Sequence, residues 1–151
     1  MGLYLVAVGR LRAGTIAALF DDYASRLRPR LKVVEVEERL KLPAAERIAR
    51  EGEKLRAAIP KGALVVALDG GGRALTSEEF AVRLGDWRDQ GRDVAFVIGG
   101  ADGLDPGLRA AAAFTLSLGP MTWPHLLVRA MLAEQLWRAQ SIRTGHPYHR
   151  G

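Results

Sequence analysis

The feature that most constrains the fold is a regular alternation of short apolar segments with longer segments whose apolar residues recur at helical spacing. The apolar run Val94–Ile98 is uninterrupted, which is typical of a parallel strand that helices cover on both faces. Alternation along the whole chain predicts an α/β fold with a largely parallel sheet flanked by helices. The predicted strands are Leu3–Val8, Leu31–Val36, Ala63–Leu68, Val94–Ile98 and Phe114–Leu118.

Capping residues mark where several helices begin. Thr76 with Glu79 three positions later forms a capping box, and Asp105 with Pro106 suits the N-cap and first position of a short helix. Gly70–Gly72 is predicted to be a turn, and Pro29 is expected to end the first helix. The other predicted helices are Ile16–Leu27, Ala44–Ile59 and one from about Pro124 to Ile142, with residues 146–151 as a tail.

Length and composition narrow the class of protein. A chain of 151 residues that is 48% hydrophobic fits a single domain over residues 1–151. The absence of cysteine excludes disulfides, thiol catalysis and cysteine-ligated metals, and a reducing cytoplasm is the expected compartment. No apolar run approaches the roughly 20 residues of a membrane-spanning helix, and no signal peptide is recognised, so no membrane is expected.

The charge balance favours a polyanionic partner. The formal net charge is +5, and Lys or Arg side chains that neutralise phosphates release condensed counterions. A metal site is not expected, because His146 and His149 have no carboxylate cluster beside them in the sequence and His125 stands apart. RNA or DNA binding therefore remains open on charge alone.

Three glycine-containing segments follow predicted strands, at the sheet edge where parallel α/β folds bind ligands. Asp69–Gly72, Gly99–Gly103 and Gly119–Thr122 are either tight turns or loops whose backbone a ligand can approach closely. None of them matches a Rossmann or P-loop phosphate motif. The sequence thus predicts a ligand site of another kind at this edge.

The last helix combines apolar and basic positions. Leu127, Met131, Leu132 and Leu136 fit a buried stripe. The arginines 129, 138 and 143 lie elsewhere on the helix and are expected to be exposed, either on a solvated face or against RNA. Glu134 is placed to pair with the arginine four residues later. The basic and aromatic tail suits base stacking and phosphate contact.

Several of these segments together resemble the RlmH family, small SPOUT enzymes that methylate N3 of a pseudouridine in large-subunit rRNA. The resemblance rests on the opening LVAVG, the loops Ile98–Leu104 and Leu118–Pro124, and the closing HPYHR. It implies a trefoil knot in the C-terminal half, a homodimer, and S-adenosylmethionine bound in the knot. The implied cofactor-binding residues are Leu68, Gly99, Leu118, Gly119, Pro120, Met121, Thr122 and Trp123. Among them, the missing side chain of Gly99 is expected to leave space for the methionine part.

Methylation at N3 requires removal of the imide proton and stabilisation of the resulting charge. The candidates are His125 or His149 as the general base or as a hydrogen-bond partner of the nucleobase edge, and Arg129 or Arg150 as the anion stabiliser. Tyr148 is the candidate for stacking on the nucleotide or positioning it. The resemblance also suggests that the tail completes the site, within one chain or across the dimer. The substrate is expected to be the assembled ribosome, recognised by shape.

Two other functions remain open on the sequence. A basic RNA-binding or ribosome-associated protein without catalysis would not bind S-adenosylmethionine saturably. A SPOUT methyltransferase for another RNA, such as a tRNA, would bind the cofactor and modify a different nucleotide.

Overall fold

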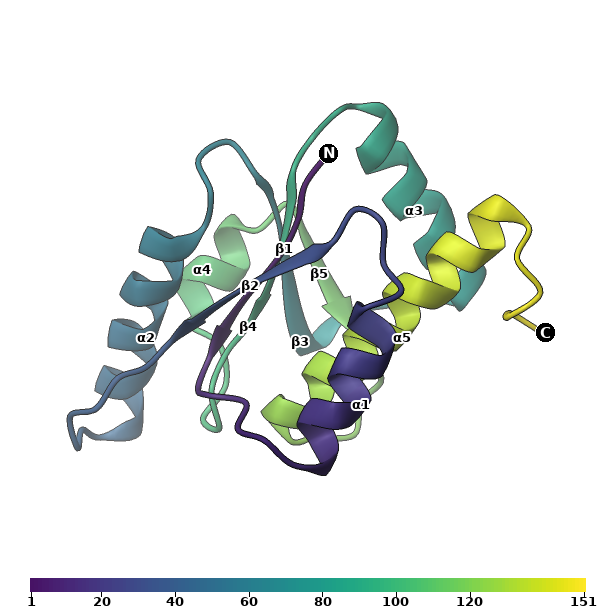
Figure 1. The fold of residues 1–151 in the computed structure, drawn as a ribbon. Coiled ribbons are helices and arrows are strands. Elements are labelled where there is room, and N and C mark those ends of the chain that lie inside the picture. Colours follow the sequence, from purple (N-terminus) through teal and green to yellow (C-terminus); the bar gives the residue numbers. More distant parts are fainter.

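The computed structural model describes residues 1–151 and contains one five-stranded sheet (Figure 1). Every neighbouring pair of strands is parallel, and the order across the sheet is β2-β1-β4-β3-β5. This arrangement confirms the predicted parallel α/β fold. The strands are β1 (Leu3–Val8), β2 (Leu31–Val36), β3 (Leu64–Ala74), β4 (Val94–Ile98) and β5 (Phe114–Ser117).

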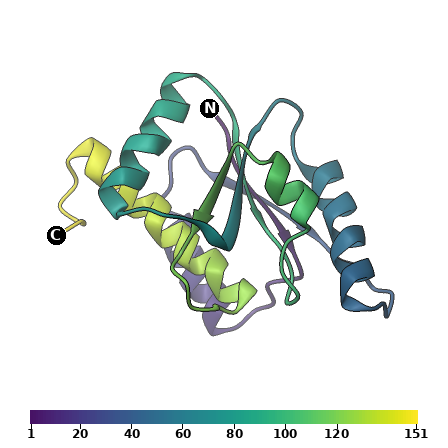
Figure 2. The same ribbon diagram turned by 180° about the vertical axis from the view of Figure 1, so that it is seen from behind.

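Helices cover both faces of the sheet. One layer contains α1, α3 and α5, and the other contains α2 and α4, as the two opposite views show (Figures 1 and 2). Each parallel connection needs a crossover, which is why the helices end up on the faces. Their bounds are α1 (Thr15–Ala24), α2 (Ala44–Ala58), α3 (Ser77–Asp89), α4 (Pro106–Ala111) and α5 (His125–Thr144).

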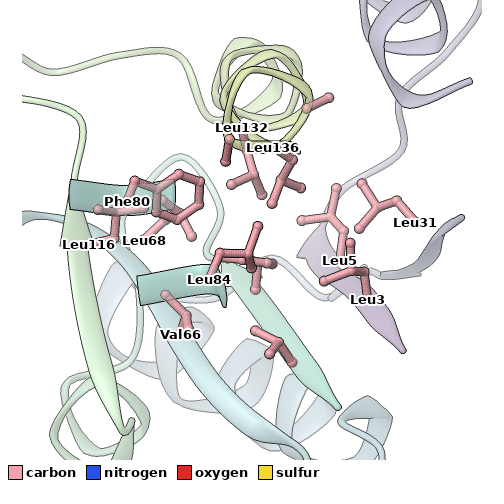
Figure 3. Close-up of a cluster of buried hydrophobic side chains, with 14 of the residues drawn as sticks. Leu3, Leu5, Leu31, Val66, Leu68, Phe80, Leu84, Leu116, Leu132 and Leu136 are labelled. Atoms are coloured by element: carbon pink, nitrogen blue, oxygen red, sulfur yellow. The ribbon is translucent and has the colours of Figure 1, made fainter. Parts of the chain in front are cut away.

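The larger hydrophobic core lies between the sheet and the layer of α1, α3 and α5. Figure 3 shows Leu132 and Leu136 of α5 among side chains of the strands, including Leu5 and Val66. Phe96 of β4 is fully buried, and a side chain of this size contributes roughly 1.5–3 kcal/mol on burial. A smaller cluster beneath α2 and α4 covers the opposite face of the same strands. All five residues of β4 are buried, as its unbroken apolar sequence predicts.

Thr76 and Asp105 are confirmed as N-cap residues, although the return bond of a capping box, from Thr76 N to the Glu79 side chain, is not formed. Thr76 Oγ1 accepts a hydrogen bond from Glu79 N at 3.1 Å, and Asp105 Oδ2 accepts one from Leu108 N at 3.1 Å. Gly145, with φ of 75°, ends α5 in the left-handed conformation that glycine adopts without a steric cost. These local contacts fix where α3, α4 and α5 begin or end.

The predicted turn at Gly70–Gly72 is wrong, because β3 continues through the glycines to Ala74. Leu116 of β5 pairs with both Leu68 and Arg73, so the residues between them bulge out of the ladder. A Cβ on Gly72 would lie only 2.6 Å from the backbone oxygen of Thr115. The glycine is therefore required by the close approach of two strands, which local sequence patterns do not reveal.

The first helix is shorter than predicted. It ends at Ala24, and Ser25 and Arg26 close the last turn by donating backbone hydrogen bonds to Asp21 O and Tyr23 O. Leu27 is buried but reaches the core from the following turn. Leu27 thus packs in the core at the position that helical spacing predicts, although it lies outside the helix. No helix in the structure is both long enough and apolar enough to span a bilayer.

Candidate active site

A cleft of about 270 Å³ opens beyond the carboxyl ends of β3, β4 and β5. Its walls come from the bulge of β3, the loop 98–104 after β4 and the loop 118–123 after β5, with His125 and Val128 of α5 at the side. All eight residues implied as cofactor-binding line this one cleft: Leu68, Gly99, Leu118, Gly119, Pro120, Met121, Thr122 and Trp123. Their role in binding remains a prediction, but the structure brings them together.

The loop after β4 is a tight turn built on glycine. Gly103 N donates a hydrogen bond to Gly100 O at 3.0 Å, and Gly103 has φ of 99°. A Cβ on Gly99 would lie 2.6 Å from Gly103 O. The expectation that Gly99 leaves space for a ligand is therefore wrong in its reason, since the loop's own backbone occupies that space. Glycine is needed here so that the turn can close against itself.

Ser117 links the bulge of β3 to the loop after β5, which form two walls of the cleft. Its Oγ lies 3.1 Å from Gly70 O in the β3 bulge and accepts a hydrogen bond from Gly119 N at 3.1 Å. Gly119 has φ of 108°, a conformation that residues with a side chain rarely adopt. Sequence analysis missed Ser117, because its contacts join segments nearly fifty residues apart.

The bulge of β3 carries a fixed carboxylate into the cleft. Asp69 Oδ2 accepts hydrogen bonds from Gly71 N at 2.9 Å and from Arg109 Nη1 of α4 at 2.9 Å. Asp69 also lines the cleft. Sequence analysis included Asp69 only as part of a glycine-containing segment, and Arg109 carries no signal that would link it to this site.

The loop after β5 presents apolar side chains to solvent. Met121 is 73% exposed and Trp123 is 41% exposed, although both are large and hydrophobic. Trp123 Nε1 donates to Leu118 O at 3.3 Å, which holds the indole against its own loop. Exposed apolar side chains around a cleft suit an aromatic ligand or a partner surface.

His125 is the only one of the predicted catalytic residues that lines the cleft. It is the first residue of α5, and its Nε2 lies 3.4 Å from the position that a Cβ on Gly9 would take. Burial lowers the pKa of His125, and the nearby positive charge of Arg129 lowers it further. The imidazole is therefore neutral at pH 7 and able to accept a proton.

Arg129 is buried, so the prediction that it lies on an exposed face is wrong. Its guanidinium is 1% exposed and donates to Glu35 Oε2, to Val8 O at 3.2 Å and to Gly9 O at 2.9 Å. Burial raises the pKa of Glu35, but the contacts with Arg129 and Leu11 N outweigh this and lower it overall. Because its contacts tie α5 to the ends of β1 and β2, Arg129 acts as a structural residue within one chain.

The tail packs along the C-terminal half of α5 and does not line the cleft. The hydroxyl of Tyr148 donates to Glu134 Oε1 at 3.1 Å, and burial together with hydrogen bonds to Tyr23 and Glu134 raises the pKa of Tyr148. The expected pair of Glu134 and Arg138 is present at 2.6 Å. Arg150 is exposed.

Both ring nitrogens of His149 are engaged. Arg138 Nη1 lies 3.0 Å from Nδ1, and Glu78 Oε1 lies 2.7 Å from Nε2. Because an arginine can only donate, Nδ1 accepts and Nε2 carries the proton that is donated to Glu78. Within one chain His149 therefore has no free nitrogen with which to act as a base. No group of His, Cys, Asp or Glu side chains is arranged to hold a metal ion.

A second cavity of about 640 Å³ adjoins the cleft, with Leu116, Leu118 and Gly119 in both walls. It lies between α1, α3 and α5 and is mostly apolar. Leu19 of α1 lines it and is 42% exposed. The side of the molecule that carries the tail thus also carries an uncovered apolar groove.

A parallel sheet with a loop-lined cleft at its carboxyl edge is the arrangement in which α/β enzymes bind their ligands. The family described as "Predicted SPOUT methyltransferase" matches residues 1–149, so the chain belongs to this family and is a methyltransferase. The chain is similar to the Ribosomal RNA large subunit methyltransferase H of Paramagnetospirillum magneticum, with 56% identity over 151 residues and 99% of each protein covered. The Rhodospirillum centenum protein of the same name is 55% identical over 151 residues, again with 99% coverage of both.

A solved structure shares the fold at much lower identity. It is the SpoU methyltransferase AviRb from Streptomyces viridochromogenes in complex with the cofactor AdoMet, with a TM-score of 0.50 and 14% identity. The match covers 92% of this chain and 58% of that one. The likeness concerns the fold alone.

Proposed function

We propose that the chain, folded as one domain over residues 1–151, transfers a methyl group from S-adenosylmethionine to N3 of a pseudouridine in large-subunit rRNA. The observation that carries this proposal is the cleft, which gathers every residue implied as cofactor-binding at the carboxyl edge of the sheet. The shared name of the close relatives supports rRNA as the substrate class. The cytoplasm is the proposed compartment.

The residues of the cleft suit this cofactor. Leu118, Pro120, Met121 and Trp123 offer an apolar surface for the faces of an adenine, and the loop backbone offers groups for its edge. The carboxylate of Asp69 is of the kind that hydroxyl or ammonium groups bind. When bound, S-adenosylmethionine supplies an electrophilic methyl group on a sulfonium centre. The loops that hold it there are predicted to form a trefoil knot.

His125 is the proposed proton acceptor. It is the one histidine beside the cleft, and its lowered pKa keeps the ring neutral at pH 7. A neutral imidazole within hydrogen-bond reach of N3–H would take the imide proton as the methyl group is transferred. The first turn of α5 begins at His125, and its N–H groups without a partner in the helix favour the negative charge that develops on the pseudouridine ring when N3 loses its proton.

The tail is proposed to act across a homodimer. Tyr148 and His149 contact Tyr23 of α1 and Glu78 of α3 beside the apolar groove, whereas the cleft of their own chain is lined by other residues. A second copy seated on that groove would cover Leu19 and Met131 and bring its own cleft toward this tail. In such an arrangement Arg150 would supply the positive charge that buried Arg129 does not.

The direct test is a map of modified nucleotides. Ribosomes from cells that lack this protein are analysed by mass spectrometry before and after incubation with purified protein and S-adenosylmethionine. The expected result is one new N3-methylpseudouridine in the large-subunit rRNA. Cofactor binding without this modification would indicate another RNA, such as a tRNA, and no saturable cofactor binding would indicate a non-catalytic RNA-binding protein.

A further inference from the structure

The carboxyl group of Glu51 is buried behind the loop that forms one wall of the cleft. Glu51 lies in α2 and is only 6% exposed. Its Oε2 and Oε1 lie 3.0 and 3.2 Å from the position that a Cβ on Gly100 would take. Gly100 itself lines the cleft. One glycine therefore separates a buried acid from the space in which the ligand is proposed to lie.

This carboxyl group has no partner that accounts for its burial. Glu51 Oε1 is fully enclosed and makes no hydrogen bond. Other buried polar groups nearby are satisfied, such as Glu38, which pairs with Arg50 at 2.8 Å. Burying an ionisable group without a partner costs stability, and such groups are found most often at functional sites.

The charged groups around Glu51 come from three elements. Arg47 lies one turn earlier in α2, but its Nε is 3.9 Å from Oδ2 of Asp102 in the cleft loop, so its charge is shared with that carboxylate. Burial raises the pKa of Glu51, Arg47 opposes this, and Asp102 and Glu38 raise it further. Arg56 is occupied by Asp105 at 2.7 Å. Arg47 therefore acts on Glu51 only at a distance, and no cation of the chain forms an ion pair with it.

We infer that Glu51 is a positioning residue for the cationic part of the cofactor, acting through the Gly99–Gly103 turn to place negative potential behind the sulfonium. The inference rests on the proposed use of S-adenosylmethionine. Gly100 has no side chain, so only its backbone lies between the carboxylate and the cleft, and the charge can act on a ligand at short range. The predicted consequence is selectivity for the sulfonium over the neutral thioether, S-adenosylhomocysteine.

The test compares the affinities of the two ligands by calorimetry. A unit charge about 10 Å from a sulfonium, at an effective dielectric of about 20, changes affinity roughly tenfold. Glu51→Gln should therefore weaken binding of S-adenosylmethionine about tenfold and that of S-adenosylhomocysteine less than about twofold. Glu53→Gln is the matched control, because Glu53 lies exposed on the same helix and its loss removes the same charge.

The acidity of Glu51 provides a second readout. In the unaltered protein, selectivity for the sulfonium should fall as the pH drops from about 8 to about 5, because a protonated Glu51 no longer attracts the cation. His125 also titrates at the cleft, but it remains in Glu51→Gln, so the difference between the two proteins isolates Glu51. Should this variant fail to fold, the same pH series is measured with His125→Ala, in which the pH dependence that remains cannot come from His125.

Each outcome is distinct. Equal weakening of both ligands, no weakening of either, or selectivity that does not vary with pH would overturn the role of Glu51 while leaving the proposed function intact. If the unaltered protein binds neither ligand, the proposed function itself fails, and this inference fails with it. Loss of sulfonium selectivity in Glu51→Gln alone, with Glu53→Gln unchanged, supports it.

Discussion

Arg129 Nη2 donates a hydrogen bond to Gly9 O at 2.9 Å, which joins the last helix to the end of the first strand. The same guanidinium bonds Val8 O and Glu35, so one buried cation closes the edge of the sheet beside the cleft. Gly9 also lies against His125, which lines the cleft. The proposed proton acceptor is therefore held in place by residues from both ends of the chain.

Replacing Arg129 with Met should destabilise the protein by about 2–4 kcal/mol, because two strand-end carbonyls and Glu35 lose a buried partner. Urea unfolding measures the change. Glu35→Gln keeps the shape of the partner and should cost less, since Arg129 retains both carbonyls. Equal stability of Arg129→Met and the unaltered protein would contradict the structural role assigned to this residue.

Replacing His125 with Ala should lower kcat for methylation about a hundredfold, while the affinity for S-adenosylmethionine changes little. In the unaltered enzyme the base must be unprotonated. Because the pKa of His125 is lowered, activity should stay level above about pH 6.5 and fall only at more acidic pH. Single-turnover rates as a function of pH test this. A profile that keeps the same acidic limb in the Ala variant would rule out His125 as the titrating base.

Deleting residues 148–151 should abolish methylation and leave S-adenosylmethionine binding nearly unchanged, because the tail does not line the cleft of its own chain. Mixing this truncated chain with His125→Ala then tests action across the dimer. Each parent has at most about one hundredth of the activity, but a mixed dimer has one complete site. Random exchange of subunits should restore about a quarter of the wild-type activity. Absence of any recovery after confirmed exchange would show that the tail acts within one chain.

Replacing Gly99 with Ala should weaken S-adenosylmethionine binding and destabilise the fold by about 1–3 kcal/mol, because the added Cβ would lie 2.6 Å from Gly103 O. Gly85→Ala is the matched control. Gly85 lies within α3, where an added Cβ meets only Arg143 at an ordinary 3.8 Å, so this change should be neutral or stabilising. Thermal unfolding and calorimetry separate the two effects. Unchanged binding by a folded Gly99→Ala protein would show that the turn need not close as it does here.

The sequence by itself determined the alternation of strands and helices, the caps at Thr76 and Asp105, and the sheet edge at which the cleft opens. These follow from local periodicity, from side chains that cap their own helices, and from the rule that parallel strands end at one edge. Resemblance to a family added the residues of the cleft. None of these conclusions required knowledge of contacts between distant segments.

Only the tertiary structure decided the rest. It showed that β3 runs through its glycines beside Thr115, that Arg129 is buried between strand ends, and that Glu51 lies behind Gly100. It also separated the tail from the cleft of its own chain. Each of these relationships joins residues far apart in sequence, and whether a glycine, an arginine or a glutamate is buried depends on which segment packs against it. Local patterns carry no record of that neighbour.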